Sequence, residues 1–429
     1  MARRFSGARA LALDISPLRD SPAYRALWIG QIISFVGTNM RYVAVPVQVY
    51  RLTGSTVAVG LIGLAEVIPL IIVSVFAGAL ADSHERRALI AKTQIGLIAS
   101  SLALAAISLM DRPSLYLIYG LTAIASAFNA LDRPARTAMT PDLVAPGKIS
   151  AAMALRQVVY QVTQIIGPLI AGLMLAVVAV SWVYLVDAIT YVAALVSLRW
   201  VPRSVPVDPN ARVNLQSIRD GLSFSLKTPL VLSIFVIDLV AMIFGMPRAV
   251  FPALAEQTFG MGPAGVGLLY AAPSIGALIG AVTTGWVKNV RRQGRAVLIS
   301  VMAWGLAITL AGLSLFSLAL TMFFLAVAGA ADVLSAVFRG TMLLEATPEE
   351  LRGRVSAVQI MVVTGGPRLG DVEAGLAAGL VGAPGSVVVG GAACVAGTVL
   401  VGWVFRSLRD YAVIPIRDRV ADQRLTTGP

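Results

Sequence analysis

Ionisable side chains within long apolar segments are the part of this sequence best suited to chemistry. Four of the carboxyl residues within such segments are the candidates for chemistry, namely Glu66, Asp238, Asp371 and Glu373. A charge at bilayer depth is costly, so such a group usually faces the interior of a helix bundle or an aqueous cavity. Burial also favours the neutral form of a carboxyl group, which can then take up and release a proton. We predict that these four residues are candidates for proton coupling, with Glu66 and Asp371 preferred.

Two arginines, Arg41 and Arg368, lie in the same kind of segment. A guanidinium at that depth can attract an anionic ligand, or it can form a structural ion pair with a carboxylate of a nearby segment. We predict that both arginines line a substrate cavity, and the structural pair remains the alternative. Asp187 and Asp332 are expected to be structural, the second because it is predicted to lie near a helix end.

Several kinds of catalytic and metal site are excluded by composition. The chain has one histidine, His84, and one cysteine, Cys394, so neither a Ser-His-Asp triad nor a cysteine or histidine metal site is expected. The glycine-rich phosphate loop of nucleotide-binding proteins is also missing from the sequence. We therefore expect no enzyme activity, no metal and no cofactor, and we expect any transport to be driven by an ion gradient or a substrate gradient.

The composition indicates that most of the surface faces lipid. Of the 429 residues, 57% are hydrophobic and only 13% are charged, whereas soluble domains have about a quarter charged residues. The net charge is +12, but the basic residues stand in short runs between apolar segments instead of forming one face. This distribution is typical of the loops of a membrane protein and argues against nucleic-acid binding.

The apolar segments are long enough to span a bilayer, which takes about 20 residues per helix. Twelve segments meet this length approximately, and they are predicted at residues 26–50, 57–81, 89–110, 114–131, 149–178, 182–200, 230–250, 266–287, 296–316, 319–338, 355–381 and 386–405. Basic residues concentrate at the two ends of the chain and in alternate loops, and the intervening loops carry only Arg51, Arg112 and Arg248. The positive-inside rule therefore predicts that both termini are cytoplasmic.

The order of these segments predicts two related halves. The domains expected are a leader at 1–25, a six-helix bundle at 26–200, a linker at 201–229 with an amphipathic helix, a second six-helix bundle at 230–405, and a tail at 406–429. A Thr-Pro pair follows the fourth span at Thr140 and the tenth span at Thr347. Parallel repeats of this kind are a recognised architecture of membrane transporters.

The loop between the second and third spans has the most specific motif, at residues 78–87 (GALADSHERR). A glycine at Gly78 allows close helix approach, Asp82 can cap a helix or pair with arginine, and Arg86 and Arg87 remain on the cytoplasmic face. We predict that this cluster is a conformational latch, and an ordinary basic loop is the alternative. Two residues expected at the end of the fourth span, Asp132 and Arg136, are predicted to belong to the latch.

The spacing and the position of this motif resemble the signature of the major facilitator superfamily. A degenerate copy follows the eighth span at residues 285–292, where Asn289 replaces the acidic residue. The resemblance implies an all-α membrane protein with twelve transmembrane helices in two pseudo-symmetric six-helix bundles. It also implies alternating access, in which the two halves rock about a site near the middle of the membrane.

The fifth span carries Gly167, Pro168 and Gly172. A proline within a helix removes one backbone hydrogen bond and permits a bend, while glycines allow neighbouring helices to pack closely. The pattern resembles the motif found in the fifth span of exporters of this superfamily. A simple packing kink is the alternative.

Within the superfamily, the sequence is similar to the enterobactin-exporter branch. The stretches that carry this similarity are residues 43–49, 251–256, 267–272, 276–280, 346–354 and 370–371. The resemblance implies a proton-coupled exporter of a siderophore or a related amphipathic molecule, acting as a monomer in the bacterial inner membrane. The alternatives are a multidrug or macrolide efflux pump of the same fold, and a non-transporting membrane sensor or assembly factor.

Overall fold

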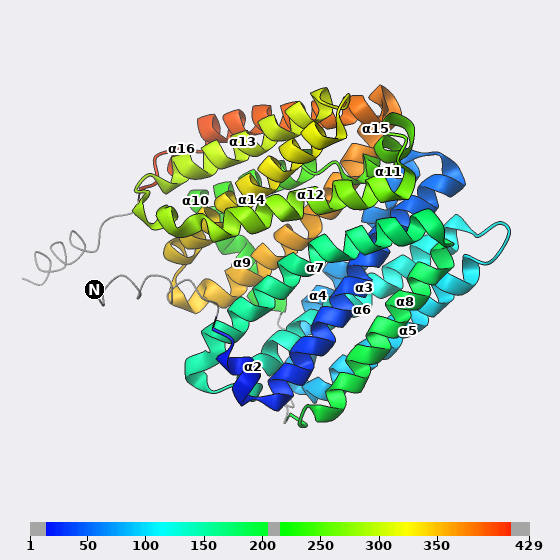
Figure 1. Ribbon diagram of the computed structural model, residues 1–429. Coiled ribbons are helices and arrows are strands. Elements are labelled where there is room, and N and C mark those ends of the chain that lie inside the picture. The colour runs from blue at the N-terminus through cyan, green and yellow to red at the C-terminus, as the bar shows by residue number, and fades with distance from the viewer. Residues whose placement is uncertain (1–13, 205–214, 413–429) are drawn as a thin grey trace, which may run out of the picture. The chain divides into compact units, whose positions relative to one another are not determined.

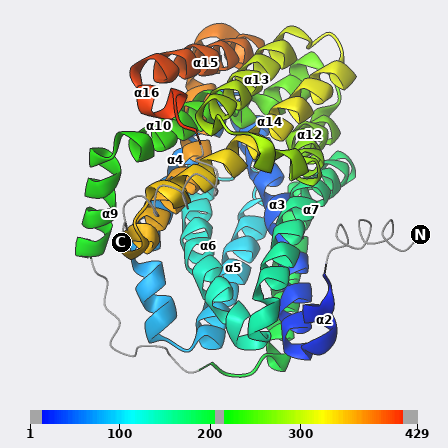
Figure 2. The same ribbon diagram turned by 90° about the vertical axis from the view of Figure 1, so that its left-hand side faces the viewer.

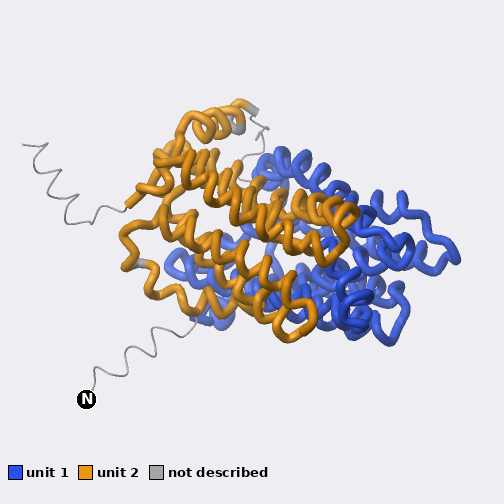
Figure 3. Tube along the Cα trace, turned by 90° about the horizontal axis from the view of Figure 1, so that it is seen from above, with its two compact units in different colours: residues 1–215, 249–274 blue, residues 216–248, 275–429 orange. Residues whose placement is uncertain are grey.

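The computed structural model describes residues 14–204 and 215–412, and every element of secondary structure in those ranges is helical (Figure 1). The chain divides into two compact units, shown in Figure 3. Unit 1 comprises Met1–Leu215 and Ala249–Ser274, and unit 2 comprises Gln216–Arg248 and Ile275–Pro429.

The elements of unit 1 are α2 (Ser16–Asp20), α3 (Pro22–Thr53), α4 (Thr56–Ser83), α5 (Arg86–Ile107), α6 (Leu115–Leu143), η1 (Pro146–Lys148), α7 (Ile149–Val177), α8 (Val180–Ser197), η2 (Leu198–Trp200), α11 (Phe251–Ala253) and the π-helix η4 (Leu254–Thr258). Those of unit 2 are α10 (Pro229–Phe244), η5 (Thr284–Asn289), α13 (Gln293–Leu313), α14 (Leu318–Ala346), η6 (Glu349–Leu351), α15 (Arg352–Val404) and α16 (Arg406–Arg409). Elements α9 (Leu215–Lys227), η3 (Arg248–Val250) and α12 (Gly262–Val282) cross a boundary between the units.

The helices account for the predicted membrane spans. Ten helices in the described part of the chain are long and apolar enough to cross a membrane. The last of them includes α15, which contains both the eleventh and the twelfth predicted spans. These two spans are separated at Gly382, whose φ of 77° and ψ of 162° interrupt the helix, and glycine adopts this positive φ without steric cost. The first predicted span coincides with α3, a helix of 32 residues.

Serine side chains fix where several of these helices begin. The hydroxyl of Ser21 accepts a hydrogen bond from the backbone N–H of Tyr24 at 3.1 Å, and Ser55 accepts one from Ala58 at 3.3 Å. Such N-caps satisfy backbone donors that the first turn of a helix leaves without a partner. At the other end of α3, Gly54 takes the left-handed conformation that commonly stops a helix.

Helix α6 extends further than the sequence predicts. The fourth span is predicted to end at residue 131, but α6 continues to Leu143. The expectation that Asp132 and Arg136 mark a helix end is therefore wrong. Their side chains form an ion pair one helical turn apart, with Arg136 Nε 2.5 Å from Asp132 Oδ2, so the charges compensate each other within the helix.

Helix α14 shows the same departure. The tenth span is predicted to end at residue 338, but α14 continues to Ala346. The expectation that Asp332 lies near a helix end is also wrong, since this residue lies in the middle of α14. Its partner Arg339 lies two turns further along the same helix and is buried, so the charges are again compensated without ending the helix.

In unit 1, α3 packs against α7, and α5 packs against α6 (Figure 2). Helix α8 packs against both α3 and α5. Large buried side chains hold these helices together, among them Tyr24, Ile90, Met139 and Leu155. The Tyr24 hydroxyl also donates to the backbone oxygen of Ala152 at 2.9 Å, which ties α3 to α7. Many leucine and isoleucine side chains on the outer surfaces are exposed, as expected for helices that face lipid.

In unit 2, α13 packs against α14 and α15, and α10 packs against α15 (Figure 1). The buried Trp304 indole donates to the backbone oxygen of Gly245 at 2.9 Å, joining α13 to the end of α10. The linker contains a helix, α9, where an amphipathic helix is predicted, and its Leu222 and Leu226 are exposed. Residues 205–214 of that linker lie outside the described residues.

Candidate functional site

Arg41 belongs to a buried polar cluster in unit 1. Its Nη1 lies 3.4 Å from Asp187 Oδ2 and donates to Ser101 Oγ at 3.4 Å, and its guanidinium lies 5.8 Å from the centre of the Tyr191 ring. Ser101 Oγ also donates to Asp187 Oδ2 at 2.7 Å. The cluster therefore joins α3 to α8 by an ion pair and joins both helices to α5 by the hydrogen bonds of Ser101. Asp187 has the structural partner that the sequence led us to expect.

Glu66 lies on α4 and is also buried. Its carboxylate acts electrostatically on Arg41, so the unit 1 cluster combines one buried arginine with two acidic side chains. The backbone oxygen of Glu66 accepts a hydrogen bond from Ser126 of α6 at 2.8 Å, which holds this turn of α4 against α6. A role of Glu66 in proton coupling stays a prediction.

Unit 2 contains a second buried cluster, on α10 and α14. Arg339 Nη2 lies 3.0 Å from Asp238 Oδ1 and 3.7 Å from Asp332 Oδ1. The side chains of Arg339 and Asp238 are each 4% exposed, and that of Asp332 is 28% exposed. One arginine thus stands between two carboxylates, one sealed inside the unit and one that is accessible from outside it.

The remaining predicted charges lie on α15. Arg368, Asp371 and Glu373 are all half-buried in the first of the two spans that α15 contains. Arg368 and Asp371 are three residues apart and so share one side of the helix. A cavity role for Arg368 and a proton-coupling role for the two acids stay predictions.

The first part of the predicted latch lies at the end of α4. Gly78 is exposed, and a Cβ placed on it would meet no described atom within 4 Å, so the close helix approach expected there is not found. Asp82, next to the last residue of α4, is also exposed. Exposure leaves the Asp82 carboxylate accessible to a partner, which is the property that a latch needs.

The arginines of the same motif bind elements of unit 1. Arg86, the first residue of α5, is buried, and its Nη1 donates to Asp142 Oδ2 at 2.6 Å and to the backbone oxygen of Ala138 at 3.0 Å. Its backbone N–H donates to Ser204 Oγ at 3.1 Å. Arg87 Nη1 donates to the backbone oxygen of Val201 at 2.7 Å. These contacts attach the loop to the end of α6 and to the beginning of the linker.

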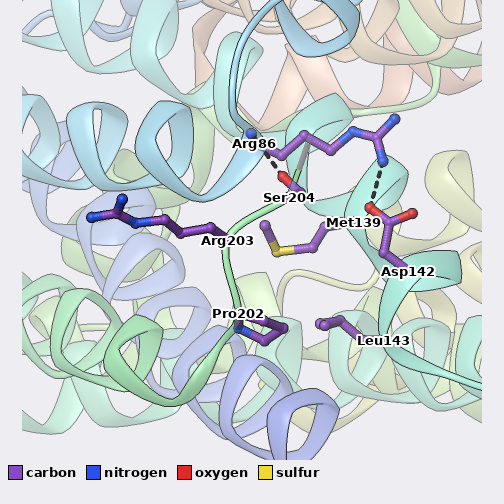
Figure 4. Close-up of a pocket in the computed structure, with 7 residues that line it drawn as sticks. All are labelled: Arg86, Met139, Asp142, Leu143, Pro202, Arg203 and Ser204. Atoms are coloured by element: carbon purple, nitrogen blue, oxygen red, sulfur yellow. Dashed lines mark hydrogen bonds and ion pairs between the residues drawn. The ribbon is translucent and has the colours of Figure 1, made fainter. Parts of the chain in front are cut away.

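These residues surround a cavity of ≈ 310 Å³, drawn in Figure 4. It is lined by Arg86, Met139, Asp142, Leu143, Pro202, Arg203 and Ser204. In the figure, Arg86 points toward Asp142, whereas Arg203 points away from this pair. The lining thus contains an arginine already paired with a carboxylate, so the cavity is a junction between the motif and the linker more than an open ligand site.

Asp132 and Arg136, the other two predicted latch residues, connect α5 to α6. Asp132 Oδ1 accepts hydrogen bonds from Thr93 Oγ1 at 2.9 Å and from Gln94 Nε2 at 3.0 Å, and Asp132 Oδ2 is held by Arg136. Both terminal nitrogens of Arg136 are buried without a hydrogen-bond partner in the described part of the chain. The structure therefore brings Arg86, Asp132 and Arg136 onto the same α5–α6 pair.

The exporter-type motif lies on α7, which is continuous through Pro168. A Cβ on Gly167 would lie 2.5 Å from Asn39 Cβ of α3, and one on Gly172 would lie 2.8 Å from the backbone oxygen of Pro263. Both glycines therefore allow a backbone to approach more closely than any other residue would permit. Close packing explains these positions, and the exporter role of the motif stays a prediction.

The described residues contain no group of three or more histidine, cysteine, aspartate or glutamate side chains placed to hold a metal ion. The buried chemistry consists of arginines and carboxylates. Sequence reasoning missed Arg339 because the predicted tenth span ended one residue before it. The spacing of Asp332 and Arg339, seven residues apart and thus on one helix face, was the signal that could have revealed the cluster.

Comparison with known proteins identifies the family. Residues 12–417 match the family described as transmembrane secretion effector (MFS_3). The chain belongs to that family. It is 34% identical over 349 residues to the enterobactin exporter EntS of Shigella boydii serotype 18, covering 81% of this chain and 83% of the exporter. The enterobactin exporter of Escherichia coli O1:K1 has the same identity and coverage. The resemblance to the enterobactin-exporter branch is confirmed.

Solved structures confirm the fold. The nucleoside transporter NupG matches with a TM-score of 0.71 and 14% identity, covering 91% of this chain and 99% of that protein. A bacterial homologue of the lysosomal transporter Spinster matches with a TM-score of 0.71 and 15% identity, covering 92% and 99%. These structures show that the chain has the major facilitator fold. The family and the relatives of 34% identity make it a multi-pass membrane transporter of a small molecule and not an enzyme.

Proposed function

We propose that this protein exports a siderophore, or a related amphipathic molecule, across the bacterial inner membrane. The observation that carries the proposal is the identity of 34% over 81% of the chain to a protein described as an enterobactin exporter. The match extends over most of both chains, so it includes spans from both predicted bundles. Both termini are cytoplasmic in this proposal, because the basic residues concentrate at the chain ends and in alternate loops.

Transport would proceed by alternating access, with the bundles at 26–200 and 230–405 rocking about a central site. One chain supplies both bundles, so the working unit would be a monomer. Gly78, Asp82, Arg86 and Arg87 would act with Asp132 and Arg136 as the latch. Two observations support this role: Asp82 is exposed, and the two terminal nitrogens of Arg136 have no hydrogen-bond partner among the described residues. Both groups can therefore bind a partner that comes within reach in only one conformation.

A proton gradient is the proposed driving force, with export coupled to proton entry. Buried carboxylates beside arginines in both units support it, because such groups change charge when a proton binds. Glu66, Asp238, Asp371 and Glu373 are the candidate proton carriers, and Arg41 and Arg368 are the candidate ligand contacts.

Comparison of culture media tests the substrate. A strain lacking the gene and its parent are grown under iron limitation, and the secreted metabolites are profiled by mass spectrometry. The proposal expects the siderophore in the medium to fall in the deletion strain and to be restored by the wild-type gene. Unchanged siderophore secretion, combined with increased sensitivity to drugs, would replace the proposal with multidrug efflux.

A further inference from the structure

One face of α14 concentrates the polar side chains of unit 2. Asp332, Ser335 and Arg339 have the spacing i, i+3 and i+7, which places them along the same side of the helix. Asp238 of α10 faces this row and forms the short contact of 3.0 Å to Arg339. These four residues form the α14 cluster.

The charges of the α14 cluster do not balance when all its groups are ionised. Arg339 lies within 4.0 Å of two carboxylates, Asp238 at 3.0 Å and Asp332 at 3.7 Å. With both acids ionised, these three side chains carry a net charge of −1, and with one proton bound they are neutral. Because net charge at this depth is costly, these three side chains have a physical reason to bind one proton, and Arg248 of η3, which acts electrostatically on Asp332, opposes it.

Three buried polar atoms of the cluster have no hydrogen-bond partner in the described ranges. They are Nη1 of Arg339, the hydroxyl of Ser335 and Oδ1 of Asp238, the last of which still lies 3.0 Å from Arg339 Nη2 as an ion pair. Arg339 therefore retains a free donor while it pairs with two acids. A guanidinium has five donors in a planar fork, so Arg339 can turn from one carboxylate toward the other without losing an ionic partner.

Accessibility distinguishes the two acids. The Asp332 side chain is 28% exposed and that of Asp238 is 4% exposed. A coupling group must gain its proton from one side of the membrane and lose it to the other, so it needs a route to water in some state of the cycle. Asp332 is the more exposed of the two acids, and Asp238 is placed to hold Arg339 when Asp332 is neutral.

We propose that Asp332 exchanges the coupling proton, with Arg339 and Asp238 as the residues that position it. The inference rests on the proton-driven export proposed above. In each cycle an O–H bond forms at the Asp332 carboxylate and later breaks, and no other bond changes. The proton neutralises the cluster, weakens the pair between Asp332 and Arg339, and lets Arg339 turn fully to Asp238.

Other charged groups lie on elements that pack against α10 and α14, and they bear on the pH dependence. Arg248 of η3 acts electrostatically on Asp332. The remaining charged side chains on these packing elements are Arg295 of α13, Glu345 of α14, Arg352, Arg354, Arg368, Asp371 and Glu373 of α15, and Arg406 and Arg409 of α16. Asp371 is the strongest competitor, because it is a half-buried carboxylate on a neighbouring helix.

The test uses the full-length protein in proteoliposomes, with enterobactin as the probe and a pH-sensitive dye in the lumen. Two quantities are measured, namely enterobactin accumulation driven by an imposed pH gradient and enterobactin exchange without a gradient. Asp332→Asn is expected to lose gradient-driven accumulation and the accompanying proton movement while exchange persists. Asp371→Asn and Glu66→Gln are measured in parallel as the competing carriers. Asp410→Asn, at an acid whose side chain is 53% exposed, is the control expected to retain gradient-driven accumulation.

Retained proton-coupled accumulation in Asp332→Asn would overturn the assignment, and so would loss of both accumulation and exchange, which indicates a structural role. Loss of coupling in Asp371→Asn alone would transfer the role to that residue. These outcomes leave the proposed export intact. A wild-type protein that moves no enterobactin, or ignores the pH gradient, overturns the proposed function and this inference with it.

A second pair of variants tests the positioning role of Arg339. Arg339→Gln removes the charge that favours ionised carboxylates, so the pH at which transport is half-maximal is expected to rise. Arg339→Lys keeps the charge and is expected to keep a pH profile close to that of the wild type. An unchanged profile in Arg339→Gln would show that Arg339 does not act on the proton-binding group.

Discussion

The ion pair between Arg41 and Asp187 allows a quantitative test of how unit 1 is stabilised. The two side chains are 4% and 0% exposed, and their charged atoms are 3.4 Å apart. Asp187→Ala would leave Arg41 as a buried charge without its main partner, which costs about 3–5 kcal/mol. Glu66 still acts electrostatically on Arg41 and offsets part of the loss. We therefore expect a decrease near the lower end, about 3 kcal/mol in the free energy of unfolding.

The measurement is an unfolding titration of the purified protein with a denaturing detergent, followed by tryptophan fluorescence. The informative comparison is the double variant Arg41→Met/Asp187→Leu, which removes both charges and retains most of the volume. We expect it to unfold within about 1 kcal/mol of the wild type, since replacing a buried pair by apolar residues is often neutral. Ser101→Ala serves as the comparison, because it keeps both charges and removes the hydroxyl that bonds to each of them; a hydrogen bond to a charged group contributes about 1.5–3 kcal/mol.

Two results would contradict this reasoning. If Asp187→Ala lowers the free energy of unfolding by much less than Ser101→Ala does, the charge of Asp187 contributes little to the folded state. A double variant as unstable as Asp187→Ala would mean that shape, and not an uncompensated charge, causes the loss. A rescue by the double variant supports the ion pair as the cause.

Three further predictions concern the latch, the coupling acids and the packing motif. Asp82→Asn is expected to reduce enterobactin flux. Membrane insertion, measured by fractionation, is expected to stay normal because the loop remains polar. Normal flux in this variant would contradict the latch. Glu66→Gln is expected to alter the pH dependence of transport if Glu66 carries a proton, and an unchanged profile would make it structural. Gly172→Val is expected to lower stability by about 1–3 kcal/mol through overpacking, since its Cβ would lie 2.8 Å from the Pro263 oxygen. Gly120→Ala, where a Cβ meets open space, is its control in the same unfolding assay.

The overall fold could be predicted because it depends on properties that are local in the sequence. A spanning helix requires about 20 apolar residues, and each predicted span coincides with a described helical segment. The prediction failed at the ends of α6 and α14, where charged residues were taken as helix ends. Whether Asp132 or Arg339 ends a helix depends on its partner, and the partner of Arg339 is the distant residue Asp238.

The candidate site was predictable in its residue types but not in its pairing. Arg41 and Asp238 were identified from their depth within apolar segments, and both are buried. Their partners, Asp187 and Arg339, lie 146 and 101 residues away along the chain. Pairing over such separations follows from how helices pack, which periodicity within a single helix does not encode. The close helix approach expected at Gly78 is absent among the described residues, since a Cβ there would meet no atom within 4 Å, and its latch role stays a prediction.

The two halves carry opposite charges at related positions. Asp132 precedes Thr140 by eight residues, and Arg339 precedes Thr347 by the same number, so counting back from each Thr-Pro pair aligns an acid with a base. Around Asp132 the donors outnumber the acid, since Thr93, Gln94 and Arg136 all bind its carboxylate.

Around Arg339 the balance is reversed, because Asp238 and Asp332 share one guanidinium. The charge of the Asp132 carboxylate is compensated by the three side chains that bind it. An arginine shared by two carboxylates leaves one of them with incomplete compensation, and a proton corrects this. Divergence at this one repeat position therefore gives the first half a rigid joint between α5 and α6 and the second half a group that can titrate. On this argument, proton exchange belongs to α14, and its counterpart in α6 keeps α5 and α6 together while the charge of the α14 cluster changes.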